Sequence, residues 1–199
     1  MIYEQTKEEL DQKIICYNAH FAKHKHQIEA ALSDAFEVDA CSLFNDLTAN
    51  ITLNPVCPRF LKERYFDIFY KNSERGALGL SLHEVIHYFR FHVWNNHFCD
   101  HYEEYETPSL KWTLSEMVVE AIMSDQRLSS INPYFPREHG GCVYPYFQDM
   151  IINGTPILKT LNEFYHNNHI TDFMELSYTY CVKHEEFIRH HIKEAEQVF

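Results

Sequence analysis

The sequence predicts an α+β fold that is predominantly α-helical, with a small sheet in the first half and a helical C-terminal half. Apolar residues recur at helical spacing over most of the 199-residue chain, and a β-like alternation appears only between residues 36 and 60. Hydrophobic residues make up 45% of the chain, which is enough for a packed core. We therefore expect a single domain over residues 1–199, in which an N-terminal lobe (about 1–96) and a C-terminal helical lobe (about 107–199) flank a cleft.

The first 70 residues are expected to form a long helix and then a small sheet. Residues 3–32 carry apolar side chains at roughly helical spacing, namely Leu10, Ile14, Tyr17, Phe21, Ile28 and Leu32. Residues 36–40 alternate between apolar and polar types, and residues 50–55 form a β-like run that a proline ends. Residues 60–70 are rich in aromatic side chains and are predicted to be a helix or helical turn.

Two strong helices are expected in the middle of the chain. The first extends from about residue 73 to residue 94 and ends at the pair Asn95 and Asn96. An acidic, aromatic loop follows at residues 99–106. Thr107 and Pro108 then supply a cap residue and a proline at the first helical position, so a second helix is predicted from there to about Arg127.

The last third of the chain is predicted to be a loop followed by two helices. Residues 131–146 contain Asn-Pro, Phe-Pro, Gly-Gly and Tyr-Pro pairs, which are typical of loops or short strands. Helical patterns follow near residues 155–167 and 170–195. We find no internal repeat and no linker.

The charge and the cysteines narrow the class of protein. Seventeen basic and 29 acidic residues give a net charge of −12, so the basic footprint of a nucleic-acid binder is missing and anionic membrane surfaces are disfavoured. The sequence shows neither a signal peptide at its N-terminus nor an apolar stretch long enough to cross a membrane. The six cysteines are far apart and include no C-x-x-C pair, which favours reduced thiols. We therefore expect a cytoplasmic protein that binds neither nucleic acid nor membrane.

The first strong helix contains an H-E-x-x-H motif formed by His83, Glu84 and His87. Two histidines four residues apart lie on one face of a helix, so both can present a ring nitrogen to one Zn²⁺. Glu84 would then lie beside a zinc-bound water and could take its proton as a general base. We accordingly expect one Zn²⁺ per chain, held in part by His83 and His87, with Glu84 as the catalytic residue.

The helix faces strengthen this interpretation. With 14 histidines in the chain, about 0.1 matches to the motif are expected by chance, and the His-x-x-x-His spacing recurs elsewhere without the glutamate. At about 100° per residue, however, His83 and His87 lie about 120° from the centre of the apolar stripe of their helix. A histidine pair that merely filled the core would lie within that stripe.

The next helix offers a third ligand, which a catalytic zinc site needs. Glu116 and Glu120 lie four residues apart on the face opposite its apolar stripe. Ordinary surface carboxylates are the alternative, but Trp112, Thr113 and other weakly polar residues flank the pair. His92 and His97 are further possible ligands.

These residues resemble the gluzincin group of zinc metallopeptidases, in which the H-E-x-x-H helix is followed by a helix carrying E-x-x-x-D. The resemblance covers residues 83–87 and 116–120, together with a similar order of elements. It implies a zincin-like fold, the zinc ligands His83, His87 and Glu116, Glu84 as general base, and Glu120 as the acid that orients a ligand histidine. It also implies a small intracellular metallopeptidase that acts on a peptide or protein substrate.

The sequence departs from the gluzincin pattern at one position and does not fit the related metzincin pattern. The acid that follows Glu116 is glutamate rather than the aspartate of the family, and the register with Glu120 as ligand and Asp125 behind it fits helical spacing less well. The metzincin pattern fails because Arg90 and Val93 stand where it needs glycine and histidine.

The sequence leaves some roles open. A donor that stabilises an oxyanion is expected in the second half, but the spacing does not select among the candidates Tyr144, Tyr165, His166, His169, Tyr178 and His184. A second metal site near His97, Cys99 and His101 is an alternative to a solvated loop. A non-catalytic, zincin-like metal-binding regulatory or interaction protein, and a helical interaction protein in which the motif is a coincidence, are the competing functions.

Overall fold

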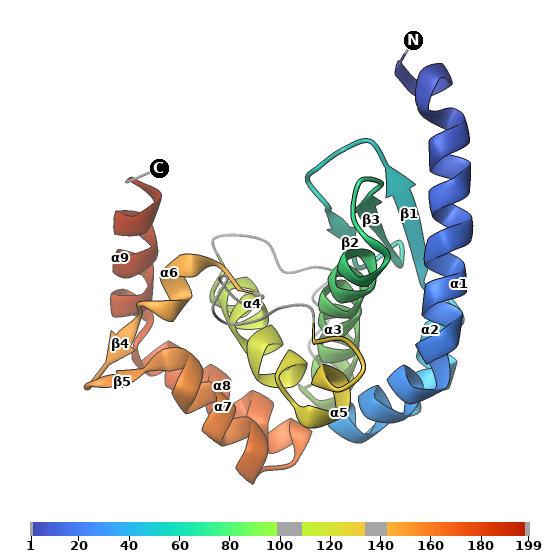
Figure 1. The fold of residues 1–199 in the computed structure, drawn as a ribbon. Coiled ribbons are helices and arrows are strands. Elements are labelled where there is room, and N and C mark those ends of the chain that lie inside the picture. The colour runs from blue at the N-terminus through green and yellow to red at the C-terminus, as the bar shows by residue number, and fades with distance from the viewer. Residues whose placement is uncertain (1, 99–108, 134–142, 198–199) are drawn as a thin grey trace.

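The computed structural model describes residues 2–98, 109–133 and 143–197, and the side chains from residue 6 onward within the first range. It is mostly helical, with a three-stranded sheet in the first half and a two-stranded hairpin in the second (Figure 1). The predicted class, α+β and predominantly α-helical, is therefore confirmed. Among the described helices, none combines the length and the apolar character needed to cross a membrane.

The first half contains three helices and three strands. In chain order these are α1 (Ile2–Phe36), α2 (Ala40–Phe44), β1 (Thr48–Thr52), β2 (Arg59–Phe60), β3 (Tyr65–Phe69) and α3 (Glu74–Phe98). The long first helix is thus confirmed and extends to Phe36. Residues 36–40 are not a strand, because Phe36 ends α1 and the carboxylate of Asp39 accepts from the backbone N–H of Cys41 at the start of α2.

The sheet has the order β1-β3-β2, with β1 parallel and β2 antiparallel to β3. The predicted helix over residues 60–70 is wrong, since β3 and half of β2 occupy this segment. Along β3, Phe66 and Ile68 are buried while the three residues between and beside them are half-buried. This period of two is that of a strand covered on one face, and the aromatic content of the segment hid it.

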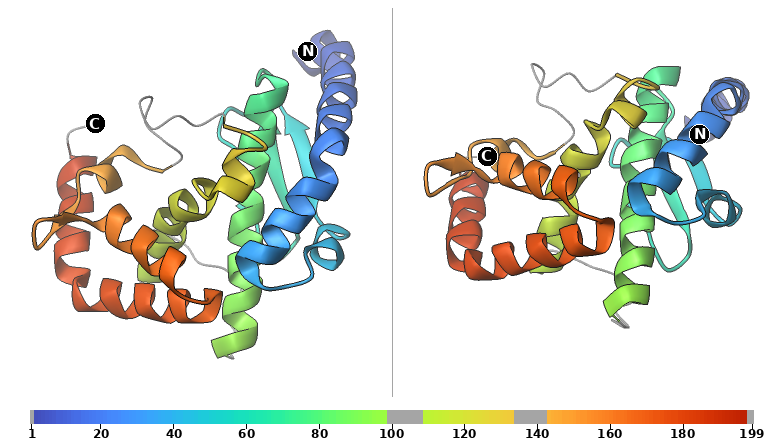
Figure 2. Two further views of the ribbon diagram at one scale, coloured as in Figure 1. Left: turned by 60° about the horizontal axis from the view of Figure 1, so that its bottom comes forward. Right: turned by 90° about the horizontal axis from the view of Figure 1, so that it is seen from below.

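Helix α3 follows the sheet and lies at the centre of the molecule (Figure 2). It begins after Ser73, whose hydroxyl accepts from the backbone N–H of Gly76, and it continues to Phe98, beyond the expected end at Asn95. On one side, α3 packs against α1 and β3. On the other side it packs against the first helix of the second half, so α3 joins the two halves.

The second half contains six helices and one hairpin among its described residues. These are α4 (Leu110–Met123), α5 (Gln126–Ser129), α6 (Pro145–Gln148), β4 (Ile151–Ile152), β5 (Thr155–Pro156), α7 (Ile157–Asn167), α8 (Ile170–Lys183) and α9 (Glu185–Glu196). The predicted helix over 170–195 is divided at His184, which lies between α8 and α9. The predicted loop at 99–106, and residues 134–142 of the loop predicted at 131–146, lie outside the described residues.

Helix α4 differs from the prediction at its end. The expected start at Thr107 and Pro108 lies outside the described residues, and the described helix begins after Ser109, whose hydroxyl accepts from the N–H of Trp112 at 3.0 Å. It ends at Met123 rather than near Arg127, because Asp125 caps the separate helix α5 by accepting from the N–H of Arg127. Helix α4 packs against α3, α7 and α8 and is buried along most of its length.

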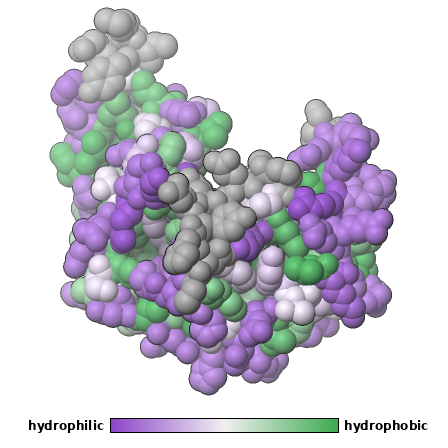
Figure 3. Space-filling view, turned by 180° about the vertical axis from the view of Figure 1, so that it is seen from behind, coloured by the Kyte–Doolittle hydropathy of each residue, from purple (hydrophilic) through white to green (hydrophobic). Residues whose placement is uncertain are grey.

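The two halves of the molecule are visible on its surface. Seen from behind, the part that carries α1 and the part that carries α9 rise on either side of a hollow (Figure 3). Hydrophilic residues dominate the rim of the C-terminal part, while green, apolar patches occur on both sides. Helices α3 and α4, one from each half, lie between these two parts (Figure 2).

Candidate metal centre

Helix α3 places the rings of His83 and His87 side by side. Their Nε2 atoms lie 3.1 Å apart, as the spacing of four residues on one helix face allows. The side chain of His87 is 1% exposed and that of His83 is 15% exposed, so one ring is enclosed and the other borders the solvent. The Nδ1 atom of His87 is buried and has no hydrogen-bond partner among the described residues.

Helix α4 brings Glu116 to the same point from the other half of the chain. Its Oε2 lies 3.7 Å from Nε2 of His83, and its Oε1 lies 3.6 Å from Nε2 of His87. Of all described His, Cys, Asp and Glu residues, these three form the one group able to hold a metal ion, with ligand atoms within 4.8 Å of one another. The surface-carboxylate alternative does not hold for Glu116, whose side chain is 5% exposed.

The three residues fit a zinc ion by donor type and by spacing. Two imidazoles and one carboxylate are a donor set that catalytic zinc sites use, with bonds of about 2.0–2.2 Å. Ligands at that distance in a tetrahedron lie about 3.4 Å from one another, which follows from the bond length and the tetrahedral angle. The two histidine Nε2 atoms are 3.1 Å apart, and they lie 3.6 and 3.7 Å from the Glu116 oxygens, so the three separations are all within about 0.3 Å of this value.

Arg59 is a part of the site that the sequence analysis missed. Its Nη2 donates to Oε1 of Glu116 at 2.8 Å, and its Nη1 lies 3.6 Å from Oε2 of Glu84. The guanidinium is thus a largely enclosed cation, 14% exposed, between the candidate ligand and the candidate base. No local pattern could reveal it, because Arg59 meets Glu116 only through the tertiary fold, 57 residues apart in sequence.

The position of Arg59 is set by the attachment of the sheet to α3. Arg59 pairs with Phe66 across the antiparallel β2–β3 ladder. The hydroxyl of Tyr88, the residue after His87 on α3, lies 2.6 Å from the carbonyl oxygen of Phe60 and 3.0 Å from that of Tyr65. These contacts fix β2 beside the histidine pair and direct the arginine toward α4.

The two carboxylates of the site differ in their acidity. Burial raises the pKa of Glu84, and the nearby charges of His83 and Arg59 only partly oppose it. Burial also acts to raise the pKa of Glu116, but the contact with His83 and the charge and hydrogen bond of Arg59 outweigh it and lower the pKa. Glu116 therefore stays ionised, as a metal ligand must, whereas Glu84 is the stronger base.

His87 is held in its neutral form. Burial, followed by the charges of Arg59, His83 and Arg90, lowers its pKa well below the usual value. A neutral imidazole has a lone pair on one ring nitrogen, and that lone pair is what a metal ion requires. Here Nε2 faces the Glu116 carboxylate and His83.

Among the described residues, none of the other predicted ligands forms a hydrogen bond with His83 or His87. Glu120 lies one turn after Glu116 on α4 and is half-buried, but neither imidazole hydrogen-bonds to it over the described part of the chain. Asp125 pairs with Arg127 and accepts from Tyr165. His92 lies 2.9 Å from Asn96 Nδ2, and the ring of His97 contacts Phe98. Cys99 and His101 lie outside the described residues.

Tyr144 is a candidate oxyanion donor whose pKa responds to the charges of the site, and 44% of its surface is exposed. Its pKa is raised by burial and by the charges of Glu116 and Glu84, while Arg59 opposes the shift. The raised pKa keeps the phenol protonated, so that it can donate a hydrogen bond. Three of the other candidates contact different residues. Tyr165 forms a hydrogen bond with Asp125, His169 forms one with Glu37, and the ring of Tyr178 packs on Trp94.

No protein-family model, curated protein or solved structure matches the chain at a significant level. The resemblance to gluzincins consequently rests on residues 83–87 and 116–120 of this chain. The spatial cluster of His83, His87 and Glu116 is a property of the structure that does not depend on that resemblance.

Proposed function

We propose that this protein is a zinc-dependent hydrolase, a small metallopeptidase that uses Glu84 as its general base. The observation that carries the proposal is the convergence of His83, His87 and Glu116 from two helices, with their ligand atoms within 4.8 Å of one another. A zincin-like fold and one Zn²⁺ per chain are parts of the same proposal. When bound, Zn²⁺ supplies a Lewis acid that polarises a carbonyl group and acidifies water.

Glu84 has the properties that a general base needs. Its Oε2 is buried and has no hydrogen-bond partner among the described residues, and burial raises its pKa above the usual value of a glutamate, which makes it a stronger base. It would accept a proton from the attacking water as the water oxygen bonds to the peptide carbonyl carbon. As the carbon–nitrogen bond breaks, Glu84 would pass that proton to the leaving amine nitrogen, so that one water is consumed for each bond cleaved.

The charge of the chain bears on the substrate. A net charge of −12 disfavours strongly acidic peptides at long range and favours neutral or basic ones. The positive charge of Arg59 lies within the site, where it would stabilise the developing negative charge of the transition state, and the phenol of Tyr144 is the proposed hydrogen-bond donor to that charge. We infer that the substrate is a neutral or basic peptide or protein segment.

A second candidate function is a non-catalytic metal-binding regulatory or interaction protein with the same site. The specific observation in its favour is Arg59, whose positive charge already neutralises Glu116 through a 2.8 Å hydrogen bond. A site whose carboxylate has a protein cation as partner is electrostatically satisfied without a metal ion. Metal binding without hydrolysis is the property that separates this function from the first.

The first test is the zinc content of the protein purified without a histidine tag or added metal. We expect about one mole of zinc per mole of chain by elemental analysis. A chain that contains no zinc and takes up none when Zn²⁺ is added contradicts both candidate functions and leaves a helical interaction protein.

The second test compares Glu84→Gln with the wild-type chain on a panel of fluorogenic peptides. Glutamine keeps the size of the side chain but cannot accept the proton, so we expect retained zinc and a loss of hydrolysis by about 10²–10⁴-fold. Wild-type rates in the variant would refute the base assignment. A zinc-loaded wild type that cleaves none of the peptides would favour the regulatory function.

A further inference from the structure

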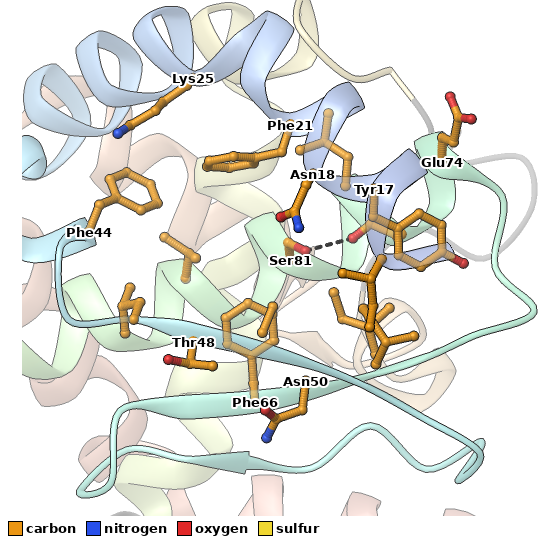
Figure 4. Close-up of a pocket in the computed structure, with 18 of the residues that line it drawn as sticks. Tyr17, Asn18, Phe21, Lys25, Phe44, Thr48, Asn50, Phe66, Glu74 and Ser81 are labelled. Carbon is orange, nitrogen blue, oxygen red and sulfur yellow. Dashed lines mark hydrogen bonds between the residues drawn. The ribbon is translucent and has the colours of Figure 1, made fainter. Parts of the chain in front are cut away.

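A second concave site lies on the side of α3 that faces away from the histidine pair. It is a cavity of ≈ 740 Å³ between α1, the sheet and α3 (Figure 4). Ser81 and Val85 contribute to its floor, and each lies two residues, or about 200° around the helix, from His83 and His87 respectively. Its volume lies within the range of about 300–1,000 Å³ typical of ligand pockets.

One wall of this cavity is the unpaired edge of β1. Within the described residues, the sheet order β1-β3-β2 leaves β1 with a strand on one side only. The N–H of Thr48 donates to Arg64 O, and Thr52 O accepts from the N–H of Tyr70, both at 3.0 Å, so Thr48 and Thr52 direct their peptide groups toward β3. Because peptide direction alternates along a strand, those of Ala49 and Ile51 point away from β3.

The cavity extends along this edge. Four consecutive residues of β1, from 48 to 51, line it. Consecutive side chains point to opposite faces of a sheet, so a space bordered by all four must include the edge between the faces. Within the described part of the chain, no hydrogen bond is formed by the peptide groups of Ala49 or Ile51. The groove therefore presents two backbone donors and two backbone acceptors.

The other residues that line the cavity suit a peptide strand in which apolar and polar side chains alternate. Ala49 and Ile51 pair with Phe66 and Ile68 of β3, which are buried, so this face of the sheet is apolar. Tyr17 and Phe21 of α1 face it across the cavity (Figure 4). A strand added beside β1 would place every second side chain against this apolar surface and the others toward the solvent.

The two ends of the groove carry opposite charges. Figure 4 places Lys25 at the end where β1 begins and Glu74 at the opposite end. Each is partly exposed: Lys25 forms a long ion pair with Glu29 at 3.6 Å, and Glu74 lies 3.7 Å from the ring of His20, whose pKa is lowered by burial. A peptide with a basic N-terminal end and an acidic C-terminal end matches these charges only when it is antiparallel to β1.

We propose that this groove binds an extended peptide segment, which adds to the edge of β1 as an antiparallel strand. Its backbone pairs with Ala49 and Ile51, and its apolar side chains, two residues apart, lie between the sheet and α1. The five residues of β1 set a length of about 17 Å, or about five residues of peptide. This site is separate from the metal centre and does not depend on hydrolysis.

The experiment uses the hexapeptide Lys-Val-Thr-Val-Thr-Glu with a fluorescent label, and the full chain carrying Glu84→Gln so that the probe is not cleaved. We expect saturable binding by fluorescence anisotropy. Adding Ala49→Pro, which removes an edge N–H but no β1–β3 hydrogen bond, should weaken binding by about tenfold or more. Ala49→Val keeps the N–H and should bind as the parent does. Equal binding to the proline and valine variants would overturn the proposal.

Hydrogen exchange on the chain without the proline provides a readout that does not depend on how that variant folds. The probe should slow exchange at the N–H groups of Ala49 and Ile51, while those of Thr48 and Asn50, which point to β3, should change little. If exchange at Ala49 and Ile51 is unchanged when the probe is saturating, strand addition is refuted. This result would also identify a probe that binds at the metal centre instead of at β1. The peptide with its terminal residues exchanged, Glu-Val-Thr-Val-Thr-Lys, matches the charges of Lys25 and Glu74 only in the less stable parallel direction, so it should bind more weakly, and equal affinity would overturn the antiparallel direction.

Discussion

Arg59 and the buried Glu116 form a part-buried ion pair that connects the two halves of the chain at the candidate metal centre. The arginine comes from β2, the glutamate from α4, and Nη2 lies 2.8 Å from Oε1. The same carboxylate faces His83 and His87 at 3.6–3.7 Å. Arg59 therefore holds the candidate ligand in its ionised form and in the orientation that a metal ion needs.

From this ion pair we predict that Arg59 and a bound Zn²⁺ both stabilise the protein through the carboxylate of Glu116. Arg59→Met should lower the free energy of unfolding of the zinc-free protein by about 3–5 kcal/mol, because it leaves a buried carboxylate without its cation. Saturating Zn²⁺ should then raise the melting temperature of the variant more than that of the wild type, since the ion neutralises the buried charge of Glu116 that has lost its arginine partner. Thermal denaturation with chelator and with zinc measures both effects.

Arg59→Met combined with Glu116→Gln is the control for this prediction. With both charges removed, the double variant should be more stable than the sum of the two single changes implies, because no unpaired buried charge remains. An equal zinc-induced shift in wild type and Arg59→Met would show that the arginine and the metal do not share Glu116.

Measurements of zinc affinity should show which of the two glutamates of α4, Glu116 or Glu120, is the metal ligand. Glu116→Ala removes a buried ligand atom from the cluster with His83 and His87, so we expect the affinity to fall by more than about a hundredfold. Glu120→Ala should change the affinity little, because no described hydrogen bond links Glu120 to either imidazole. Competition with a chromophoric chelator measures both. The opposite result would assign the ligand role to Glu120 and favour the register with Asp125 behind it.

Helix periodicity indicates which residues share a face, so it places His83 and His87 together on α3 and both Glu116 and Glu120 opposite the apolar stripe of α4. The choice of Glu116 as the third ligand rested on the resemblance to gluzincins. Arg59 could not be predicted in this way. Its role depends on the antiparallel pairing of β2 and on a contact across 57 residues, neither of which a local pattern carries.

Two errors in the predicted fold have local causes. Residues 60–70 were predicted as helical because their aromatic side chains obscured the alternation of buried Phe66 and Ile68. The β4–β5 hairpin was missed although its signal is present. Asn153 and Gly154 have φ angles of 52° and 80°, and the Asn-Gly pair is a strong indicator of a two-residue hairpin turn.

Tyr144→Phe should affect catalysis more than substrate binding. If the phenol stabilises the oxyanion, its removal lowers kcat by about 10²–10³-fold and changes KM little. Tyr165→Phe is a matched control, because Tyr165 contacts Asp125 and Arg127 rather than the metal centre. Steady-state kinetics on the best fluorogenic peptide tests both variants. Equal kcat values for wild type and Tyr144→Phe would remove this tyrosine from the proposed mechanism.

Asp125 should make the stability of the protein depend on pH between about 4 and 2. Burial acts to raise its pKa, but hydrogen bonds from Arg127 and Tyr165 outweigh it and lower the pKa to about 2. Because this value lies below the usual value of about 3.9, the ionised carboxylate favours the folded state above pH 4, and this contribution is lost as the pH falls to about 2. It amounts to about 1–2 kcal/mol.

Asp125→Asn isolates the charge, because asparagine also caps helices and can still accept from the N–H of Arg127. We expect the wild type to be more stable than the variant by about 1–2 kcal/mol at pH 6, and the difference to shrink toward zero near pH 2. Urea denaturation of both proteins at a series of pH values measures the difference. A difference that stays constant from pH 6 to pH 2 would mean that Asp125 acts through its hydrogen bonds alone and that its charge adds no stability.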